Sequence, residues 1–171
     1  MLKTLLLHGN RLELLPPDMG TLPSLLILDA SSNALCAVPE SLGYLQSLQE
    51  LNLSSNTLEE LPPSLGGLRC LQKLNLSSNG TLRALPSLSQ MVSLRSLDVE
   101  ACALAELPSI SEMKSLRSLS WKKNPLQRPP ASVAAQGLDA IRRYFDELER
   151  AAADVRPRAL QAVAAVNTPT S

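Results

Sequence analysis

Residues 48–62 read LQELNLSSNTLEELP, a stretch that combines the alternation of a β-strand with a tight turn. Leu51 and Leu53 are two residues apart, so in an extended strand both point to the same side. Asn56 follows where the chain turns away, and Leu58 then returns to the apolar side. One such unit is too short to bury its own apolar face, so it needs neighbours of the same kind.

The same pattern recurs along the chain every 22 or 23 residues. The first leucine of each copy is Leu2, Leu25, Leu48, Leu71, Leu94 and Leu116. The asparagine column is Asn10, Asn33, Asn56, Asn79, Cys102 and Asn124. We expect these side chains to bond backbone groups that the tight turn leaves without partners, as a ladder along the stack. Agreement at several columns with one period predicts six stacked turns of a solenoid, with six parallel strands on the concave side and irregular loops on the convex side.

Three copies depart from the pattern at one residue each. An extra residue follows Asn79, and we expect Gly80 to absorb it through its conformational freedom. Cys102 stands in the asparagine column, where a small thiol is a weak hydrogen-bond former; a redox role is the alternative. Trp121 occupies an inward position of the last copy, and we expect it to close the core.

The pattern changes after Asn124. Apolar residues then recur at three- and four-residue spacing, at Leu138, Ile141, Phe145, Leu148, Ala152 and Val155. This spacing predicts an amphipathic helix that covers the end of the solenoid. We therefore divide the chain into repeats over 1–130, a capping helix over 131–156 that Pro157 interrupts, and a short helix or flexible tail over 157–171. The first copy has no equivalent cap, which predicts a partner or further repeats at that end.

Composition narrows the functional classes. The chain has 171 residues, 44% of them apolar, with 16 basic and 16 acidic side chains. This balance argues against a nucleic-acid partner, and no apolar run reaches the roughly 18 residues of a membrane span. Three cysteines, odd in number and spread one per turn, favour a reducing compartment, so we expect a cytoplasmic protein.

Catalytic chemistry has little support in this sequence. His8 is the only histidine, and no cysteine, aspartate or glutamate lies at metal-ligand spacing around it. Glycine-rich phosphate-binding motifs are also missing from the sequence. We therefore predict a non-catalytic protein with no metal and no cofactor.

The remaining candidate is a protein-binding site on the concave face. Solenoids commonly bind partners on such an extended surface. The candidate residues are Asn52, Lys73, Asn75, Arg95, Asp98, Glu100, Arg117, Lys122 and Lys123. Two adjacent-strand pairs, Glu50 with Lys73 and Glu100 with Lys122, offer the alternative that these charges only satisfy each other. Aromatic anchors, which usually dominate binding energy, are missing from these rows.

These features together resemble a known family. VPESLGYL at 38–45, LPPSLGGL at 61–68 and the ending NPLQRPPASVAAQGLDAIRRYF at 124–145 resemble the intracellular Ras-group leucine-rich-repeat proteins, which include Ras–Raf scaffolds and plant relatives. The ending is also similar to a ubiquitin ligase that carries such repeats. The resemblance implies an α/β leucine-rich-repeat solenoid, a horseshoe with a C-terminal capping helix, that acts as a scaffold in intracellular signalling. The alternative is the substrate-recognition part of a larger enzyme, such as a ubiquitin ligase or a kinase.

Overall fold

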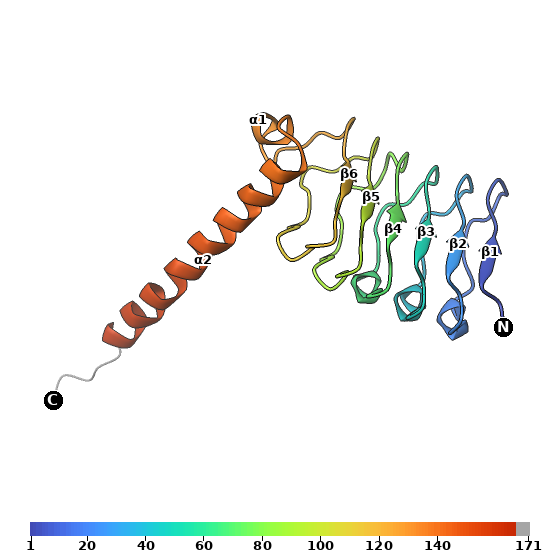
Figure 1. The fold of residues 1–171 in the computed structure, drawn as a ribbon, viewed down its shortest axis with the longest axis horizontal. Coiled ribbons are helices and arrows are strands. Elements are labelled where there is room, and N and C mark those ends of the chain that lie inside the picture. Colours follow the sequence, from blue (N-terminus) through green and yellow to red (C-terminus); the bar gives the residue numbers. More distant parts are fainter. Residues whose placement is uncertain (167–171) are drawn as a thin grey trace.

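A computed structural model describes the backbone of residues 1–166 and the side chains of residues 1–154. Six strands of three residues each form one parallel sheet in chain order (Figure 1). They are β1 (Thr4–Leu6), β2 (Ile27–Asp29), β3 (Glu50–Asn52), β4 (Lys73–Asn75), β5 (Ser96–Asp98) and β6 (Ser118–Ser120). The sheet is open, with β1 and β6 at its two edges, and it curls little, so six turns make a short stack.

The strands pair in the register that the repeat period predicts. The central leucine of each strand lies opposite the next, so Leu28, Leu51, Leu74 and Leu97 form one row. All four are buried, whereas the residues on either side of them point outward. Because strand side chains alternate, this single register places one apolar row inside and two rows outside.

Leucine fills one continuous core that runs from Leu15 in the first turn to Phe145 in the C-terminal helix. The first leucines of the second to sixth copies are almost completely buried: Leu25, Leu48, Leu71, Leu94 and Leu116. Each fully buried leucine stabilises the fold by about 1.5–3 kcal/mol. A core with so few aromatic residues therefore depends on stacking many equivalent leucines.

The loops opposite the sheet contain a short 3-10 helix in each of the first three turns. These are η1 (Met19–Thr21), η2 (Glu40–Tyr44) and η3 (Pro63–Gly67). Gly43 in η2 is buried against the backbone of Ser64 in the next turn, at a contact that leaves no room for a Cβ atom. Between β4 and β6, where the structure describes every residue, the loops are one residue shorter and form no such helix.

Asparagine side chains join each turn to the one before it. The Asn56 amide nitrogen Nδ2 donates to the carbonyl oxygens of Leu53 and Ala30, each at 3.0 Å. Its Oδ1 accepts the backbone N–H of Leu35 at 3.0 Å. Asn33, Asn79 and Asn124 make the equivalent bonds. The predicted ladder is confirmed, and it supplies partners for backbone groups that the turn would otherwise leave unpaired.

The residue before each member of the asparagine column has a left-handed backbone. The φ angles lie between 53° and 68° at Gly9, Ser32, Ser55, Ser78, Ala101 and Lys123. Such a conformation is uncommon for residues other than glycine. The repeat pattern did not predict this column, and Gly9 was its only signal in the sequence.

One of the two variant turns differs from its prediction, and the other agrees with it. The extra residue in the fourth copy does not need the freedom of glycine, because the left-handed residue there is Ser78 and Gly80 is not among the positive-φ glycines. The Cys102 thiol takes over part of the asparagine role, donating to the carbonyl oxygen of Leu76 at 3.3 Å. The Cys102 side chain is buried, and this hydrogen bond to the backbone gives it a structural role.

Two helices, rather than one, follow the last strand. The short helix α1 (Ala131–Ala134) and the long helix α2 (Leu138–Val166) are separated near Gly137, which has a φ of 91°. The predicted interruption at Pro157 is wrong, since α2 continues through it. A proline costs the helix one hydrogen bond, and the alanines on both sides of it are strong helix formers. Residues 167–171, the end of the predicted tail, lie outside the described residues.

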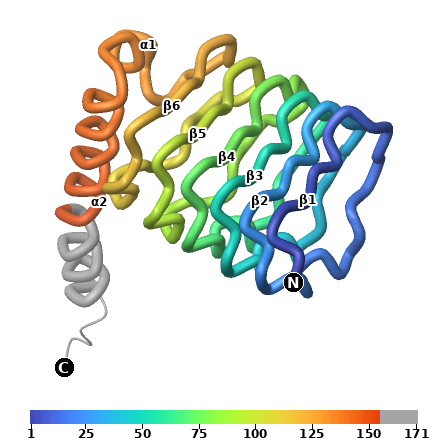
Figure 2. Tube along the Cα trace, turned by 45° about the vertical axis from the view of Figure 1, so that its right-hand side comes forward, coloured from blue at the N-terminus to red at the C-terminus, as the bar shows by residue number. Residues whose placement is uncertain are grey.

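The first turns of α2 cap the solenoid (Figure 2). Ile141 and Phe145 are buried in the core, and the Arg142 guanidinium donates to the Leu116 carbonyl oxygen at 3.2 Å. The Glu149 carboxylate accepts bonds from the hydroxyls of Ser109 at 2.6 Å and Ser111 at 2.7 Å. Leu148 and Ala152, which the spacing assigned to the apolar face, are exposed. Among the side chains that the structure describes, the capping contacts therefore involve the first part of the predicted apolar face, and Val155 lies outside these side chains.

Candidate protein-binding surface

We call one surface of the sheet the strand face. It consists of the outward side chains of β1–β6, together with the residue two positions after the end of each strand. Its two strand rows are Thr4, Ile27, Glu50, Lys73, Ser96, Ser118 and Leu6, Asp29, Asn52, Asn75, Asp98, Ser120. The third row is His8, Ser31, Ser54, Ser77, Glu100 and Lys122. Six of the predicted site residues belong to these rows, namely Asn52, Lys73, Asn75, Asp98, Glu100 and Lys122, whereas Arg95 and Arg117 precede β5 and β6 and Lys123 follows the third row.

Three predicted site residues hold their own chain in place. The Oδ1 atom of Asn52 accepts the backbone N–H of Ser54 at 3.2 Å, and Asn75 accepts that of Ser77 at 3.0 Å. Asp98 does the same for Glu100 at 3.0 Å. Their side chains are half-buried. These three residues thus have a structural role that the sequence analysis did not assign to them.

Asp29 shows the same role in a charged form. Its Oδ1 accepts the backbone N–H of Ser31 at 3.0 Å and the Ser31 hydroxyl at 2.6 Å. Burial alone would raise the pKa of Asp29, but the hydrogen bonds from Ser31 and Asn52 outweigh it and lower the pKa below its ordinary value. The carboxylate is therefore ionised at neutral pH and bound within its own turn.

Two ion pairs cross neighbouring strands. The predicted pair is confirmed between Lys73 and Glu50, with Nζ and Oε1 2.7 Å apart. The partner of Glu100 is Lys123, at 3.0 Å, and not Lys122 as predicted. Lys123 has a left-handed backbone, so strand alternation no longer tells which lysine faces Glu100. Both pairs are exposed and contribute at most about 1 kcal/mol each.

Four basic residues flank β5 and β6 and carry accessible charge: Arg95, Arg117, Lys122 and Lys123, which we call the basic end. All four residues are exposed. Arg95, Arg117 and Lys122 form no ion pair with any side chain in residues 1–154. Charge that is not neutralised within the chain is available to steer a partner of opposite sign.

An aromatic side chain lies beside this basic end. Trp121 follows β6 and packs against the core while remaining partly exposed, as expected for a residue that closes the stack. It lines a hollow of about 500 Å³, which we call the tryptophan pocket. The pocket is bounded by Trp121, Lys122, Lys123, Asn124, Leu126, Ala131, Ala134, Ala135 and Gly137. Sequence reasoning missed it because α1 forms its far wall.

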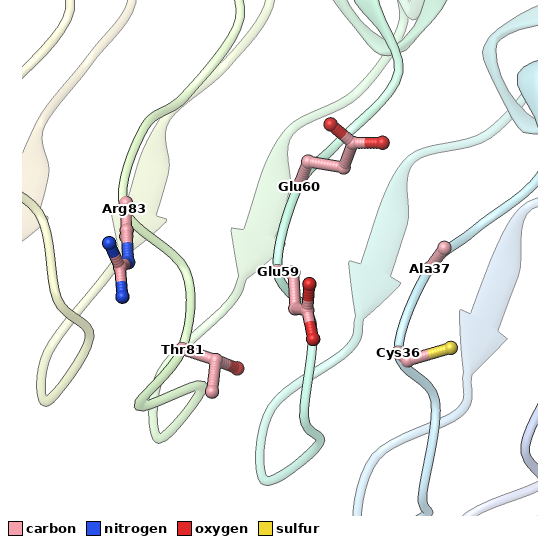
Figure 3. A pocket seen from close by; sticks show the side chains of 6 residues that line it. All are labelled: Cys36, Ala37, Glu59, Glu60, Thr81 and Arg83. Carbon is pink, nitrogen blue, oxygen red and sulfur yellow. The ribbon is translucent and has the colours of Figure 1, made fainter.

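A second hollow, of about 600 Å³, lies on the segments that follow the asparagine turns (Figure 3). Cys36, Glu59, Glu60 and Arg83 line it from three successive turns. Among the described residues, no three His, Cys, Asp or Glu side chains come together in a way that could hold a metal ion. The Cys36 sulfur and the Glu59 and Glu60 carboxylates of this hollow are therefore not grouped as metal ligands would be.

The first turn exposes apolar side chains at the β1 edge. Leu2, Leu6 and Leu14 are 48%, 60% and 69% exposed, whereas the leucines equivalent to Leu2 in later copies are buried. The partner or further repeats expected at this edge stay a prediction. In the part of the chain that the structure describes, no helix has the length and hydropathy needed to cross a membrane.

Solved structures of other proteins contain the same arrangement. The receptor-kinase ectodomain of GASSHO1/SCHENGEN3 from Arabidopsis thaliana, solved with CASPARIAN STRIP INTEGRITY FACTOR 2, matches at 31% identity and a TM-score of 0.63 over 73% of this chain and 16% of its own. PEPR1, solved with AtPEP1, matches at 35% identity and a TM-score of 0.64, over 72% of this chain and 18% of its own. The leucine-rich-repeat domain of the type III effector XopL matches at 28% identity and a TM-score of 0.63, over 71% of this chain and 45% of its own.

This chain spans less than half of each of these proteins. Comparison with curated proteins gives no match. The family model described as leucine rich repeat matches residues 1–58, 31–80 and 46–104, which is more than half of the chain. Repeats of this kind are in general non-catalytic modules for protein–protein interaction. With its period, its asparagine column and its parallel sheet, the chain belongs to the leucine-rich-repeat family.

Proposed function

We propose that the protein is a non-catalytic interaction module that binds a protein partner on the strand face. The observation that carries the proposal is the basic end, where Arg95, Arg117 and Lys122 are exposed and unpaired among the described side chains. A charged, polar face sets orientation and association rate more than affinity. Two neighbours support a binding role for such a stack, since GASSHO1/SCHENGEN3 was solved in complex with CASPARIAN STRIP INTEGRITY FACTOR 2 and PEPR1 with AtPEP1.

The test is partner capture with charge-reversed variants. The folded chain is immobilised, a partner is identified by mass spectrometry, and its dissociation constant is measured for the double variant Arg117→Glu/Lys122→Glu. We expect binding to weaken by at least about tenfold, or about 1.4 kcal/mol. Arg69→Glu, an exposed reversal on the loops opposite the sheet, is the matched control and should leave binding unchanged. Equal binding of all three proteins would refute the strand-face site.

The setting we propose is cytoplasmic Ras-type signalling, where the protein would act as a scaffold. The support is the resemblance of the loops at 38–45 and 61–68 and of the ending at 124–145 to intracellular Ras-group proteins. A panel of Ras-type GTPases, each loaded with GDP or with a non-hydrolysable GTP analogue, tests it directly. Nucleotide-dependent binding that Lys122→Glu weakens is the expected result, and no binding to any member would refute this setting.

The second candidate is the recognition part of a larger enzyme. It is favoured by the similarity of the ending at 124–145 to a ubiquitin ligase that carries such repeats. Sequencing of the full transcript distinguishes the two candidates, since an open reading frame that continues into a kinase or ubiquitin-ligase domain supports only the second.

A further inference from the structure

The tryptophan pocket is built by residues from two unlike parts of the chain. Trp121 lies directly after β6, and Ala131, Ala134 and Ala135 come from α1 and its C-terminal end. The alanines are short, so the space opposite the indole, about 500 Å³, is not filled by the protein itself. An aromatic wall facing small side chains is a shape that accepts one large apolar side chain.

The charged residues of the pocket wall determine which partner residues can lie next to the inserted apolar side chain. Lys122 and Lys123 are the only charged residues in the pocket wall, and both are exposed. Lys123 already binds Glu100, whereas Lys122 pairs with no described side chain. An acidic neighbour of the inserted side chain would therefore meet an uncompensated ammonium group, while a basic neighbour would be repelled.

The pocket is also continuous with the strand face. Lys122 belongs both to the pocket wall and to the third row of that face, at the C-terminal end of β6, whereas Arg95 and Arg117 directly precede β5 and β6. A partner lying across the basic end would thus reach the pocket without leaving the surface. Tryptophan is enriched among residues that dominate binding energy, a role that the polar rows themselves do not fill.

We propose that the tryptophan pocket is the anchor site for a peptide segment in which a large apolar residue is flanked by acidic residues. This inference rests on the proposed strand-face function and names the chemistry of the partner at that face. The apolar side chain inserts between Trp121 and α1, and the acidic flanks lie over Lys122 and the basic end. Burial supplies the affinity and the lysines select the orientation and the acidic sequence.

The experiment uses a displayed library of random dodecapeptides selected against the whole protein. Trp121 is the only tryptophan in the chain, so the change of its fluorescence reports occupancy of this pocket. Ala135→Phe fills the pocket from an exposed position, and Lys122→Glu reverses the charge at its wall. Arg69→Glu, on the loops opposite the sheet, is the matched charge-reversal control, and Lys73→Glu probes the middle of the strand face. Circular dichroism and thermal melts of each variant establish that it is folded.

We expect the selected peptides to share a large apolar residue with acidic neighbours, and to change the Trp121 fluorescence on binding. Ala135→Phe and Lys122→Glu should each weaken binding by about tenfold or more, with Arg69→Glu having little effect. Peptides without this composition, or bound peptides that leave the fluorescence and the two pocket variants unaffected, would overturn the inference. If such peptides are instead sensitive to Lys73→Glu, the strand-face function stands without the pocket. No selection at all would overturn the pocket, while the partner-capture test decides the strand face separately.

Discussion

The backbone N–H of Leu82 donates to the carbonyl oxygen of Asn79 at 3.0 Å, inside the turn that Gly80 lengthens. In the other copies the equivalent leucine N–H binds the Oδ1 atom of the next asparagine, at Asn33, Asn56, Asn79 and Asn124. Here the next column member is Cys102, whose thiol is a poor acceptor. The extra residue and the cysteine therefore compensate each other across two turns.

This relationship predicts coupled energies. Deleting Gly80 gives the fourth copy the shorter turn that the third copy has and directs the Leu82 N–H at Cys102, so we expect a loss of about 1–3 kcal/mol for one unpaired buried donor. Cys102→Asn alone should also destabilise, since its Oδ1 has no donor. The double variant should cost less than the sum of the two. Urea unfolding of the four proteins measures the coupling, and strict additivity would contradict it.

Close packing between the loops opposite the sheet makes a second prediction. A Cβ atom at Gly43 would overlap the backbone carbonyl oxygen of Ser64, which belongs to the next turn and cannot move alone. Gly43→Ala should therefore destabilise by about 2–3 kcal/mol, which lowers the melting temperature by roughly 5–10 °C. Gly67→Ala is the matched control, because its Cβ would meet only an ordinary contact at 3.4 Å. A similar melting temperature for both variants would show that the loops yield.

The cap should respond to acid through Glu149. Hydrogen bonds from Ser109, and then from Ser111, lower the pKa of this carboxyl below its ordinary value. A lowered folded pKa stabilises the cap above the ordinary glutamate value of about 4.3, and this contribution is lost as the pH falls through the folded pKa. Hydrogen exchange of α2 amides at pH 7 and pH 3 should show faster opening in acid. Glu149→Gln should open faster at pH 7 and change less with pH than the native chain.

Thiol reactivity should separate the three cysteines. Cys36 and Cys70 are exposed, whereas Cys102 is buried and burial raises its pKa. Because the thiolate is the reactive form, Ellman's reagent at pH 8 should label two thiols quickly and the third only after unfolding. The variant Cys102→Ala should keep both fast thiols and lose the slow one. Three fast thiols in the native protein would contradict the buried site and reopen a redox role for Cys102.

The sequence was sufficient for most of the features that repeat. A period of 22 or 23 residues, an alternation of two and an asparagine column determine six parallel strands, their register and the Glu50–Lys73 pair, because equivalent residues in stacked turns must lie in rows. The hydrogen bonds from the asparagine side chains to the backbone of neighbouring turns also followed from the repeat pattern. The left-handed column did not, since the serines before Asn33, Asn56 and Asn79 carry no signal of positive φ.

Tertiary structure alone decided what happens where the repeat changes. The partner of Glu100 depends on the backbone turn at Lys123, and the tryptophan pocket exists only because α1 lies against Trp121 at the last strand. The physical reason is that periodicity specifies contacts between like residues in neighbouring turns. Contacts between a turn and a helix that follows no such period depend on where the chain bends, here near Gly137. The residues we propose for partner selection lie at this end.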